Sequence, residues 1–418
     1  MEYEVSAQDR QILRELAKKQ LFYASQECNL KRREEWYRHN ELQGERPLIH
    51  LEMGTFEQEI LPERMRCTGA LARQLERTLY CNFLNQELFD DDRVTPDYFA
   101  VGYDSYFTLF GLQVKVQGVK DADGNVSVGH HFLSQIEDLE EDWSKLGETR
   151  FGVNPEASLE RKGAIEEVIG DILPVRLEGS CLYSVPTQMV VHLMSMETMM
   201  FSMYDYPELF KEMMGRIADD TLAYYRLLEK EGLILPTTGG GSLGQGSWCY
   251  NHTLPKDKAP GSYTTKDVWG FMDSQETVGI SPEMFEEFIF PCYKKISENY
   301  GLLSYGCCEP VDPVWENCIS RLENLRKVSI SPWCNEEYMG ERLRGSRVIY
   351  HRKPSPNYLG TGTVLDEEAF RTHIRKSLQA ARGCEMEITQ RDVYTINRDI
   401  PKAKRYVDII KEEIVNCW

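Results

Sequence analysis

Two adjacent thiols and a carboxylate stand together in the sequence at Cys307, Cys308 and Glu309. They follow the apolar stretch 301–306, which has the length and composition of a buried strand. Thiolates favour zinc, which can hold a further ligand or polarise an oxygen, so this triplet is a candidate metal site. Cys334 follows the next predicted strand and is the expected third ligand. The alternative is that these cysteines are buried as small apolar residues.

Polar side chains follow the other predicted strands as well. Carboxylates in such places serve as general bases or electrostatic stabilisers, or else as hydrogen-bonded structural groups. We predict catalytic roles for Asp273, Glu276, Tyr305 and Asp392, and substrate-binding roles for Glu309, Trp333, Lys353 and His252. His252 lies in the long loop 239–266, where an exposed histidine is more often idle than functional.

The stretch 239–246 is rich in glycine and has the composition of a phosphate-binding loop. It lacks the Gly-Lys-Ser/Thr ending and the strand-to-helix spacing of the nucleotide-binding fingerprints. We therefore expect a mobile loop over the pocket, in which glycine supplies unusual backbone angles.

These residues need a scaffold that gathers strand ends at one edge. From about residue 160, helices and strands alternate: helices are predicted at 155–171 and 205–231, and strands at 233–238, 268–273, 301–306, 327–331, 346–350 and 385–390. This repeated order predicts a parallel sheet with crossover helices. At this count a closed (β/α)8 TIM barrel of the α/β class fits better than an open sheet. The active site of such a barrel lies at the carboxyl ends of its strands.

The N-terminal part has a different character. Residues 1–45 are rich in charged and amide side chains, with apolar Ile12, Leu13 and Leu16 at helical spacing. We interpret them as a helical extension that caps the barrel or mediates a homodimer. Residues 46–418 are then the catalytic TIM-barrel domain, which begins with a short buried strand at 46–51. A turn signal at 121–125 predicts a hairpin.

Composition narrows the class of protein. The chain has 418 residues, 41% hydrophobic residues and a formal net charge of -19, which disfavours nucleic acid and anionic membranes as partners. No N-terminal signal is recognisable, and no apolar run approaches the length of a membrane span. The 12 scattered cysteines are typical of reduced thiols or metal ligands. We therefore expect a cytoplasmic protein.

Two separated blocks, 194–210 and 280–295, resemble the uroporphyrinogen decarboxylase superfamily and precede the site at 305–309 in the same order. The resemblance covers roughly residues 165–415 and implies a TIM barrel. It also implies either decarboxylation or zinc-dependent methyl transfer with a corrinoid protein. The decarboxylases carry an Arg-rich N-terminal motif for porphyrinogen carboxylates. The nearest stretch here, 64–66, lacks the rest of that motif, which argues against porphyrinogen decarboxylation.

The methyltransferases of the superfamily have a His-x-Cys pair where this chain has Tyr305-Gly-Cys307. Cys307 therefore matches their zinc-ligand cysteine, and Tyr305 replaces the histidine. Their remaining ligand is a cysteine near the last strand. Cys384 precedes that strand in this chain, whereas Asp392 stands at its carboxyl end. We therefore do not assign Cys384 to the site.

The resemblance implies a methyltransferase of anaerobic one-carbon metabolism. It would move a methyl group between a small O-, N- or S-methyl compound, such as a methoxylated aromatic, and a cobalamin-type corrinoid on a partner protein, assisted by Zn²⁺. The alternative is a metal-independent decarboxylase of a small organic acid that uses Asp273, Glu276 or Asp392. A third hypothesis is a non-catalytic subunit with a degenerate site.

Overall fold

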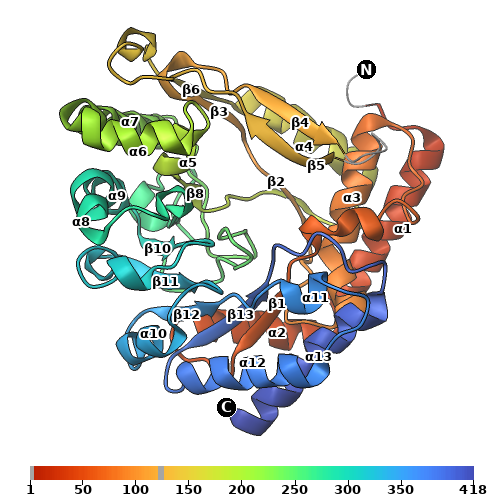
Figure 1. Cartoon of the computed structure of the whole chain (residues 1–418). Coiled ribbons are helices and arrows are strands. Elements are labelled where there is room, and N and C mark those ends of the chain that lie inside the picture. Colours follow the sequence, from red (N-terminus) through yellow and green to blue (C-terminus); the bar gives the residue numbers. More distant parts are fainter. Residues whose placement is uncertain (1–3, 121–126) are drawn as a thin grey trace.

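The computed structural model describes residues 4–120 and 127–418, and it is built on a curled sheet of parallel strands ringed by helices (Figure 1). Seven of the described strands form one continuous ladder. In spatial order they are β1 (Leu48–Leu51), β13 (Met386–Gln390), β12 (Ile349–Arg352), β11 (Leu325–Ile330), β10 (Leu302–Tyr305), β9 (Trp269–Met272) and β8 (Leu182–Tyr183). The sequence-predicted strands at 268–273, 301–306, 327–331, 346–350 and 385–390 all correspond to members of this ladder.

The hydrogen-bonded ladder is not closed, although its strands curl around a common interior. We call this curled, open arrangement of strands the ring. β2 (Phe99–Val101) and β7 (Val175–Leu177) pair separately in parallel, and β7 leads within a few residues into β8 at one edge of the main sheet. The described residues therefore form an open, barrel-like α/β fold. The prediction of parallel strands with crossover helices is confirmed, whereas the closed hydrogen-bonded barrel is not found. The predicted strand at 233–238 is wrong, because these residues have no regular structure.

The backbone amides and carbonyls at the free edge of β1 bond to residues of a loop and not to a neighbouring strand. Ile49 exchanges hydrogen bonds with Asp92: the Ile49 amide donates to Oδ2 at 2.8 Å, and the Asp92 amide donates to the Ile49 carbonyl at 2.8 Å. The Leu51 amide donates to Asp91 Oδ2 at 2.8 Å, and Asn85 Nδ2 donates to the Leu51 carbonyl at 2.7 Å. Buried backbone groups need such partners, so residues 85–92 take the place of a neighbouring strand beside β1. We call this open edge of the sheet the seam.

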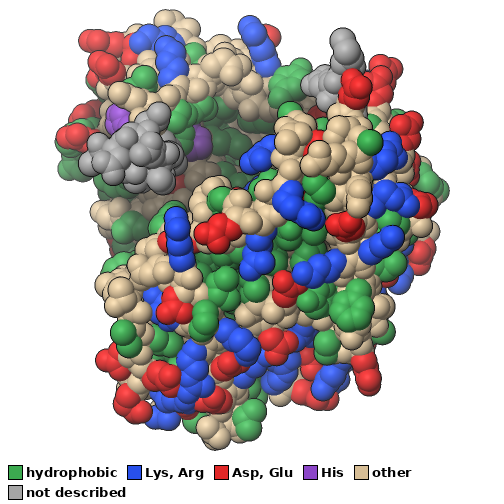
Figure 2. All heavy atoms as spheres, turned by 90° about the vertical axis from the view of Figure 1, so that its right-hand side faces the viewer, with side chains coloured by type: hydrophobic (Ala, Val, Ile, Leu, Met, Phe, Trp, Pro, Cys, Tyr) green, Lys and Arg blue, Asp and Glu red, His purple; other side chains and the backbone are tan. Residues whose placement is uncertain are grey.

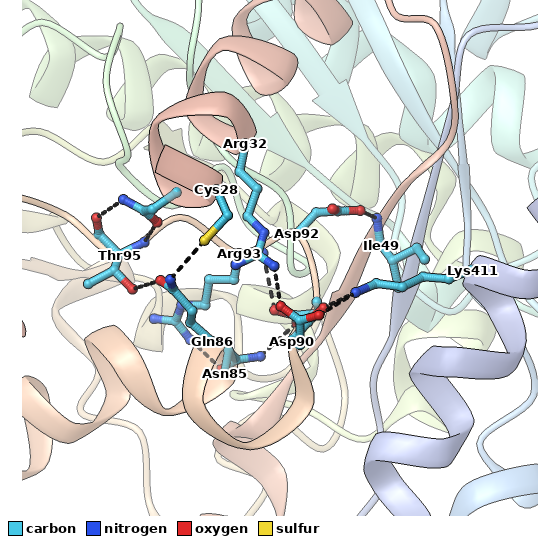
Figure 3. Close-up of polar contacts among 12 residues, drawn as sticks. Cys28, Arg32, Ile49, Asn85, Gln86, Asp90, Asp92, Arg93, Thr95 and Lys411 are labelled. Carbon is cyan, nitrogen blue, oxygen red and sulfur yellow. Dashed lines mark hydrogen bonds and ion pairs between the residues drawn. The ribbon is translucent and has the colours of Figure 1, made fainter. Parts of the chain in front are cut away.

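Charged side chains fasten this seam to both ends of the chain (Figure 3). Asp90 pairs with Arg32 of α2 (Glu27–Asn40) and with Lys411 of α13 (Ile400–Cys417). Asp92 also pairs with Arg46 at 2.7 Å. The first helices and the last helix are therefore joined through one acidic segment.

The other helices surround the ring. They are α1 (Ala7–Ala24), α3 (Ala70–Leu84), α4 (Pro155–Ile169), α5 (Pro186–Val191), α6 (Met196–Asp205), α7 (Pro207–Lys230), α8 (Pro282–Met284), α9 (Phe290–Ser297), α10 (Glu336–Leu343), α11 (Asn357–Gly360) and α12 (Glu367–Ala380). The predicted N-terminal extension is helical, and α1 buries Ile12, Leu13 and Leu16 as it packs against α3 and α4. Acidic and basic side chains are interspersed on the face that contains α1, α3 and α13 (Figure 2).

Two antiparallel pairs lie outside the ring. β3 (Asp104–Thr108) pairs with β6 (Arg150–Asn154), and β4 (Val116–Lys120) pairs with β5 (Ser127–Phe132). The predicted hairpin is therefore present, although its turn signal at 121–125 lies outside the described residues. Within the described ranges, no helix has both the length and the apolar character needed to cross a membrane.

The glycine-rich segment after α7 projects onto the middle of the ring in Figure 1, and its contacts place it inside the ring and not over its mouth as predicted. The Gly246 carbonyl accepts hydrogen bonds from His50 of β1 at 2.8 Å and from Thr389 of β13 at 3.3 Å. Lys327 of β11 donates to Ser247 Oγ at 2.6 Å. Contacts to three strands of the ring place this segment as an interior plug, which we define as residues 237–251.

Buried charges hold the plug in place. Lys327 Nζ also donates to Glu387 Oε2 at 2.7 Å, and both side chains are almost completely buried. Glu387 further contacts His39 Nε2 at 2.9 Å and His351 Nδ1 at 3.2 Å. Although burial opposes ionisation, Lys327 and His351 hold the pKa of Glu387 well below its usual range. The ring interior is therefore ionic at this level, and not the purely apolar core typical of closed barrels.

Candidate functional site

The two adjacent thiols lie just beyond the carboxyl end of β10. Cys307 Sγ and Cys308 Sγ are 3.3 Å apart. Cys307 Sγ also lies 3.0 Å from Gln245 Oε1, and Cys308 Sγ lies 3.2 Å from Asp392 Oδ2. The hydrogen bond with Cys308, together with burial, raises the pKa of the Cys307 thiol. The Cys307 thiol is therefore held in its protonated form, and the pair has an oxygen neighbour on each side.

Gln245 reaches the thiols because the plug adopts a rare backbone conformation. Gly244, Gln245 and Gly246 have consecutive φ angles of 82°, 50° and 82°. Three left-handed residues in a row favour glycine on either side of Gln245. A Cβ on Gly244 would stand 2.8 Å from the Phe271 ring. Such strain at a non-glycine residue is characteristic of functional sites.

Glu309 and the strand ends fix the backbone of the thiol pair. Glu309 accepts hydrogen bonds from the amides of Cys307 at 2.8 Å and Ser274 at 3.0 Å. The Cys307 carbonyl accepts from Ser329 Oγ at 2.7 Å and from Lys353 Nζ at 3.2 Å. Burial lowers the pKa of Lys353. Glu309 and Lys353 thus hold the thiol loop, and the substrate binding predicted for them stays a prediction.

Asp273 is the most perturbed acid of the site. Its side chain is almost fully buried; Oδ2 accepts a hydrogen bond from Gln245 Nε2 at 3.3 Å, while Oδ1 has no partner. Burial, with repulsion from Glu309 and Cys307, raises the pKa of Asp273 to about 9. The carboxyl group therefore carries a proton at neutral pH, and perturbed acids of this kind mark functional sites.

This proton gives a testable pH dependence. Because the folded-state pKa of Asp273 exceeds the ordinary value, the folded chain binds one proton more than the unfolded chain between about pH 4 and pH 9. The free energy of unfolding therefore falls as pH rises through this window. Asp273→Asn cannot ionise and removes the loss. In urea denaturation, we expect the free energy of unfolding of the variant, relative to that of wild type, to rise by at least about 1 kcal/mol between pH 5 and pH 8.

Asp257→Asn, at an exposed loop position, is the control and should leave the pH profile unchanged. Parallel profiles for Asp273→Asn and wild type would contradict the assignment of a protonated Asp273.

Asp392 joins the site from the end of β13. Its backbone has a φ of 59°, another left-handed conformation of a non-glycine residue. The neighbouring Arg391 lies 3.5 Å from Asp392 Oδ1 and 3.2 Å from Glu52 Oε2. The residues that follow β1 and β13 therefore meet at Arg391, and Asp392 reaches Cys308 from this side, which agrees with the predicted position of Asp392.

Four other predicted residues contact groups other than the two thiols, and a fifth, Trp333, is exposed. Cys334 Sγ lies 3.4 Å from the Val311 amide nitrogen and 3.9 Å from the Glu309 carbonyl oxygen. Tyr305 bonds to Ser274 Oγ, and Glu276 accepts from Thr187 Oγ1 at 2.8 Å. Trp333 is 75% exposed. His252 stacks on Tyr37 and contacts Glu41.

The donor atoms at the thiol pair fit zinc in type. Two sulfurs and the carboxylate of Asp392 are ligands that zinc accepts. The predicted set of Cys307, Cys308 and Cys334 is not brought together. Within the part of the chain that the structure describes, no three His, Cys, Asp or Glu side chains are grouped as a metal site. The two thiols and the adjacent carboxylate of Asp392 therefore form an incomplete set of zinc ligands.

Sequence reasoning missed Gln245, Arg391 and Tyr183. Tyr183 stacks on Phe271 with ring centroids 5.0 Å apart, and burial raises its pKa. The run of glycines was the sequence signal that could have indicated Gln245, because glycines favour backbone conformations with positive φ.

Comparison with known proteins gives little further information. No family model matches the chain, and no curated protein matches it. Among solved structures, a methyltransferase from Methanosarcina mazei is similar, with 13% sequence identity, coverage of 81% of this chain and 85% of that chain, and a TM-score of 0.44.

Proposed function

We propose that the chain is a methyltransferase that passes a methyl group between a small substrate and a corrinoid on a partner protein, with zinc held at Cys307 and Cys308. The observation that carries this proposal is the dithiol itself. It stands at the carboxyl end of β10 among Gln245, Asp273 and Asp392, where parallel barrels place their active sites. A bound zinc would act there as a Lewis acid on the heteroatom that carries the methyl group.

The chain's own groups would prepare this chemistry. Gln245 orients the Cys307 thiol, and Asp392 stands beside Cys308 as the nearest further ligand. Ser329 and Lys353 hold the Cys307 carbonyl and so fix the loop. Asp273 keeps a proton at a carboxyl oxygen and supplies it to a leaving heteroatom, as a general acid.

The test is the zinc content of anaerobically purified wild type beside Cys307→Ser and Cys308→Ser. We expect about one zinc per chain in the wild type and a content near zero in either variant, because a site with a single sulfur binds weakly. Cys334→Ser is the matched control. Cys334 was the third ligand predicted from sequence, but its sulfur contacts the Glu309 carbonyl oxygen at 3.9 Å. This variant should therefore keep its zinc.

Wild type without metal, under reducing conditions and with zinc supplied, would contradict the zinc-dependent mechanism. Zinc lost from Cys334→Ser as well would contradict the ligand assignment.

One observation favours a second candidate, a metal-independent decarboxylase of a small organic acid. A carboxyl group that stays protonated at neutral pH, as the raised pKa of Asp273 implies, can protonate the carbanion left when carbon dioxide departs. Metal-free wild type that turns over a small acid, together with inactive Asp273→Asn, would establish this alternative. Retained zinc at the dithiol would favour methyl transfer.

A further inference from the structure

A cavity of about 630 Å³ lies between β3, β8 and α7, apart from the dithiol. Its volume is typical of small-molecule sites. The interior plug lines it at 240–242, three residues before Gln245, and Tyr183 lines it from β8. Tyr183 and the plug thus border both the cavity and the thiol site.

Aromatic rings form the walls of this cavity. Tyr183 stacks one face on Phe271 and remains 49% exposed. Tyr106 lies against the backbone of Gly152, where a Cβ would stand 2.9 Å from the ring, and it remains 59% exposed. Tyr224 packs edge-on against Phe107, with ring centroids 5.8 Å apart. Packing therefore fixes one side of these rings, and the faces of aromatic rings carry negative potential.

One carboxylate also lines this cavity. Glu178 is half-buried in the cavity lining, with its oxygens next to the glycines of the plug at 239 and 241. Burial raises its pKa, and the hydroxyl of Tyr98 and the charge of Arg176 act against that rise. Arg176 lies over the Tyr98 ring, 4.8 Å from its centroid. Among the described residues Glu178 forms no ion pair, so its charge lacks a direct counterion.

We propose that this cavity binds an organic ammonium ion whose nitrogen carries methyl groups. Several aromatic rings and one carboxylate that has no ion-pair partner among the described residues attract a large, weakly hydrated cation. A primary ammonium ion would need several hydrogen-bond acceptors, whereas a methylated nitrogen needs only surrounding rings and one negative charge.

Calorimetric titration of the full chain with two probes of nearly equal shape tests the binding itself. Choline carries a trimethylammonium group, and 3,3-dimethyl-1-butanol replaces that group by a neutral tert-butyl group. We expect choline to bind at least about tenfold more tightly, because only its charge interacts with the rings and with Glu178. Equal affinity for both probes, or no binding of choline, would overturn the proposal.

Two kinds of variant locate the site. Glu178→Gln should weaken choline binding about tenfold and leave the neutral probe unaffected, and Tyr106→Leu, at an exposed ring, should weaken choline binding about threefold. Glu137→Gln, outside this cavity, is the control. Unchanged choline affinity in folded Glu178→Gln and Tyr106→Leu would also overturn the proposal.

The zinc assay keeps this inference separate from the proposed function. Zinc at the dithiol without choline binding would leave the proposed mechanism in place and reject the cation site. Choline binding to a zinc-free protein would support the cation site and reject the zinc-dependent mechanism.

Discussion

Lys327→Met is expected to lower the free energy of unfolding by about 3–5 kcal/mol. Lys327 and Glu387 are 0% and 1% exposed, and their 2.7 Å contact is the main compensation for burying both charges. Removal of the cation leaves Glu387 charged in a medium that solvates it poorly, and it also takes the donor away from Ser247 in the plug. Urea denaturation of wild type and variant measures the effect.

A double variant separates the lost pair from the lost packing. Glu387→Gln removes the negative charge and keeps groups that can bond to His39 and His351. We expect Lys327→Met with Glu387→Gln to be less destabilised than the sum of the single variants, since the two residues are in direct contact. Lys256→Met, at an exposed loop position, serves as the surface control. A loss below about 1 kcal/mol in Lys327→Met would contradict a structural role for the buried pair.

Gly246→Ala should destabilise the chain by about 2–4 kcal/mol, through backbone strain and a clash together. Gly246 has a φ of 82°, and a Cβ there would stand 2.4 Å from Thr389 Cγ2. Thermal or urea unfolding measures the loss. The change would also move Gln245 away from Cys307, because the strained conformation of the plug is what brings the two side chains together.

Two matched variants divide this effect into its parts. Gly345 has a φ of 66° and open space around its Cβ position, so Gly345→Ala measures the backbone strain alone. Thr389→Ser keeps the hydroxyl and removes the clashing methyl group, so it should restore part of the stability of Gly246→Ala. Equal losses in Gly246→Ala and Gly345→Ala would show that the clash contributes nothing.

The parallel strands of the second half were predictable because each is a short apolar run that ends in polar residues. The stretch 233–238 has the same apolar character but contains Pro236, which cannot donate to a ladder. Those residues instead contribute a side chain: Thr237 Oγ1 accepts from the Trp269 amide at 2.8 Å. The missing ladder beside β1 was not predictable either, since carboxylates of a loop replace the strand there.

The dithiol was found from sequence because adjacent cysteines at a strand end are visible in one line of text. Its partners were not, because the contact between Gln245 and Cys307 spans 62 positions. Cys334 follows the neighbouring strand, yet its thiol contacts the backbone carbonyl of Glu309. Tyr305 lies against Tyr293 of an outer helix, so its position on the strand did not reveal its direction. Strand order indicates which ends are close, while side-chain direction depends on packing.

The interior plug also has a consequence for how the chain folds. Its Gly246 carbonyl joins His50, 196 positions earlier, to Thr389, 143 positions later. Contacts of such sequence separation form late, because the loops that they close are costly in entropy. Thr389 follows Gly246 by 143 positions, so the ring interior can be completed only after the segment between them has been synthesised. Until then Gln245 has no fixed place, and the two thiols remain open to oxidants and to stray metal ions.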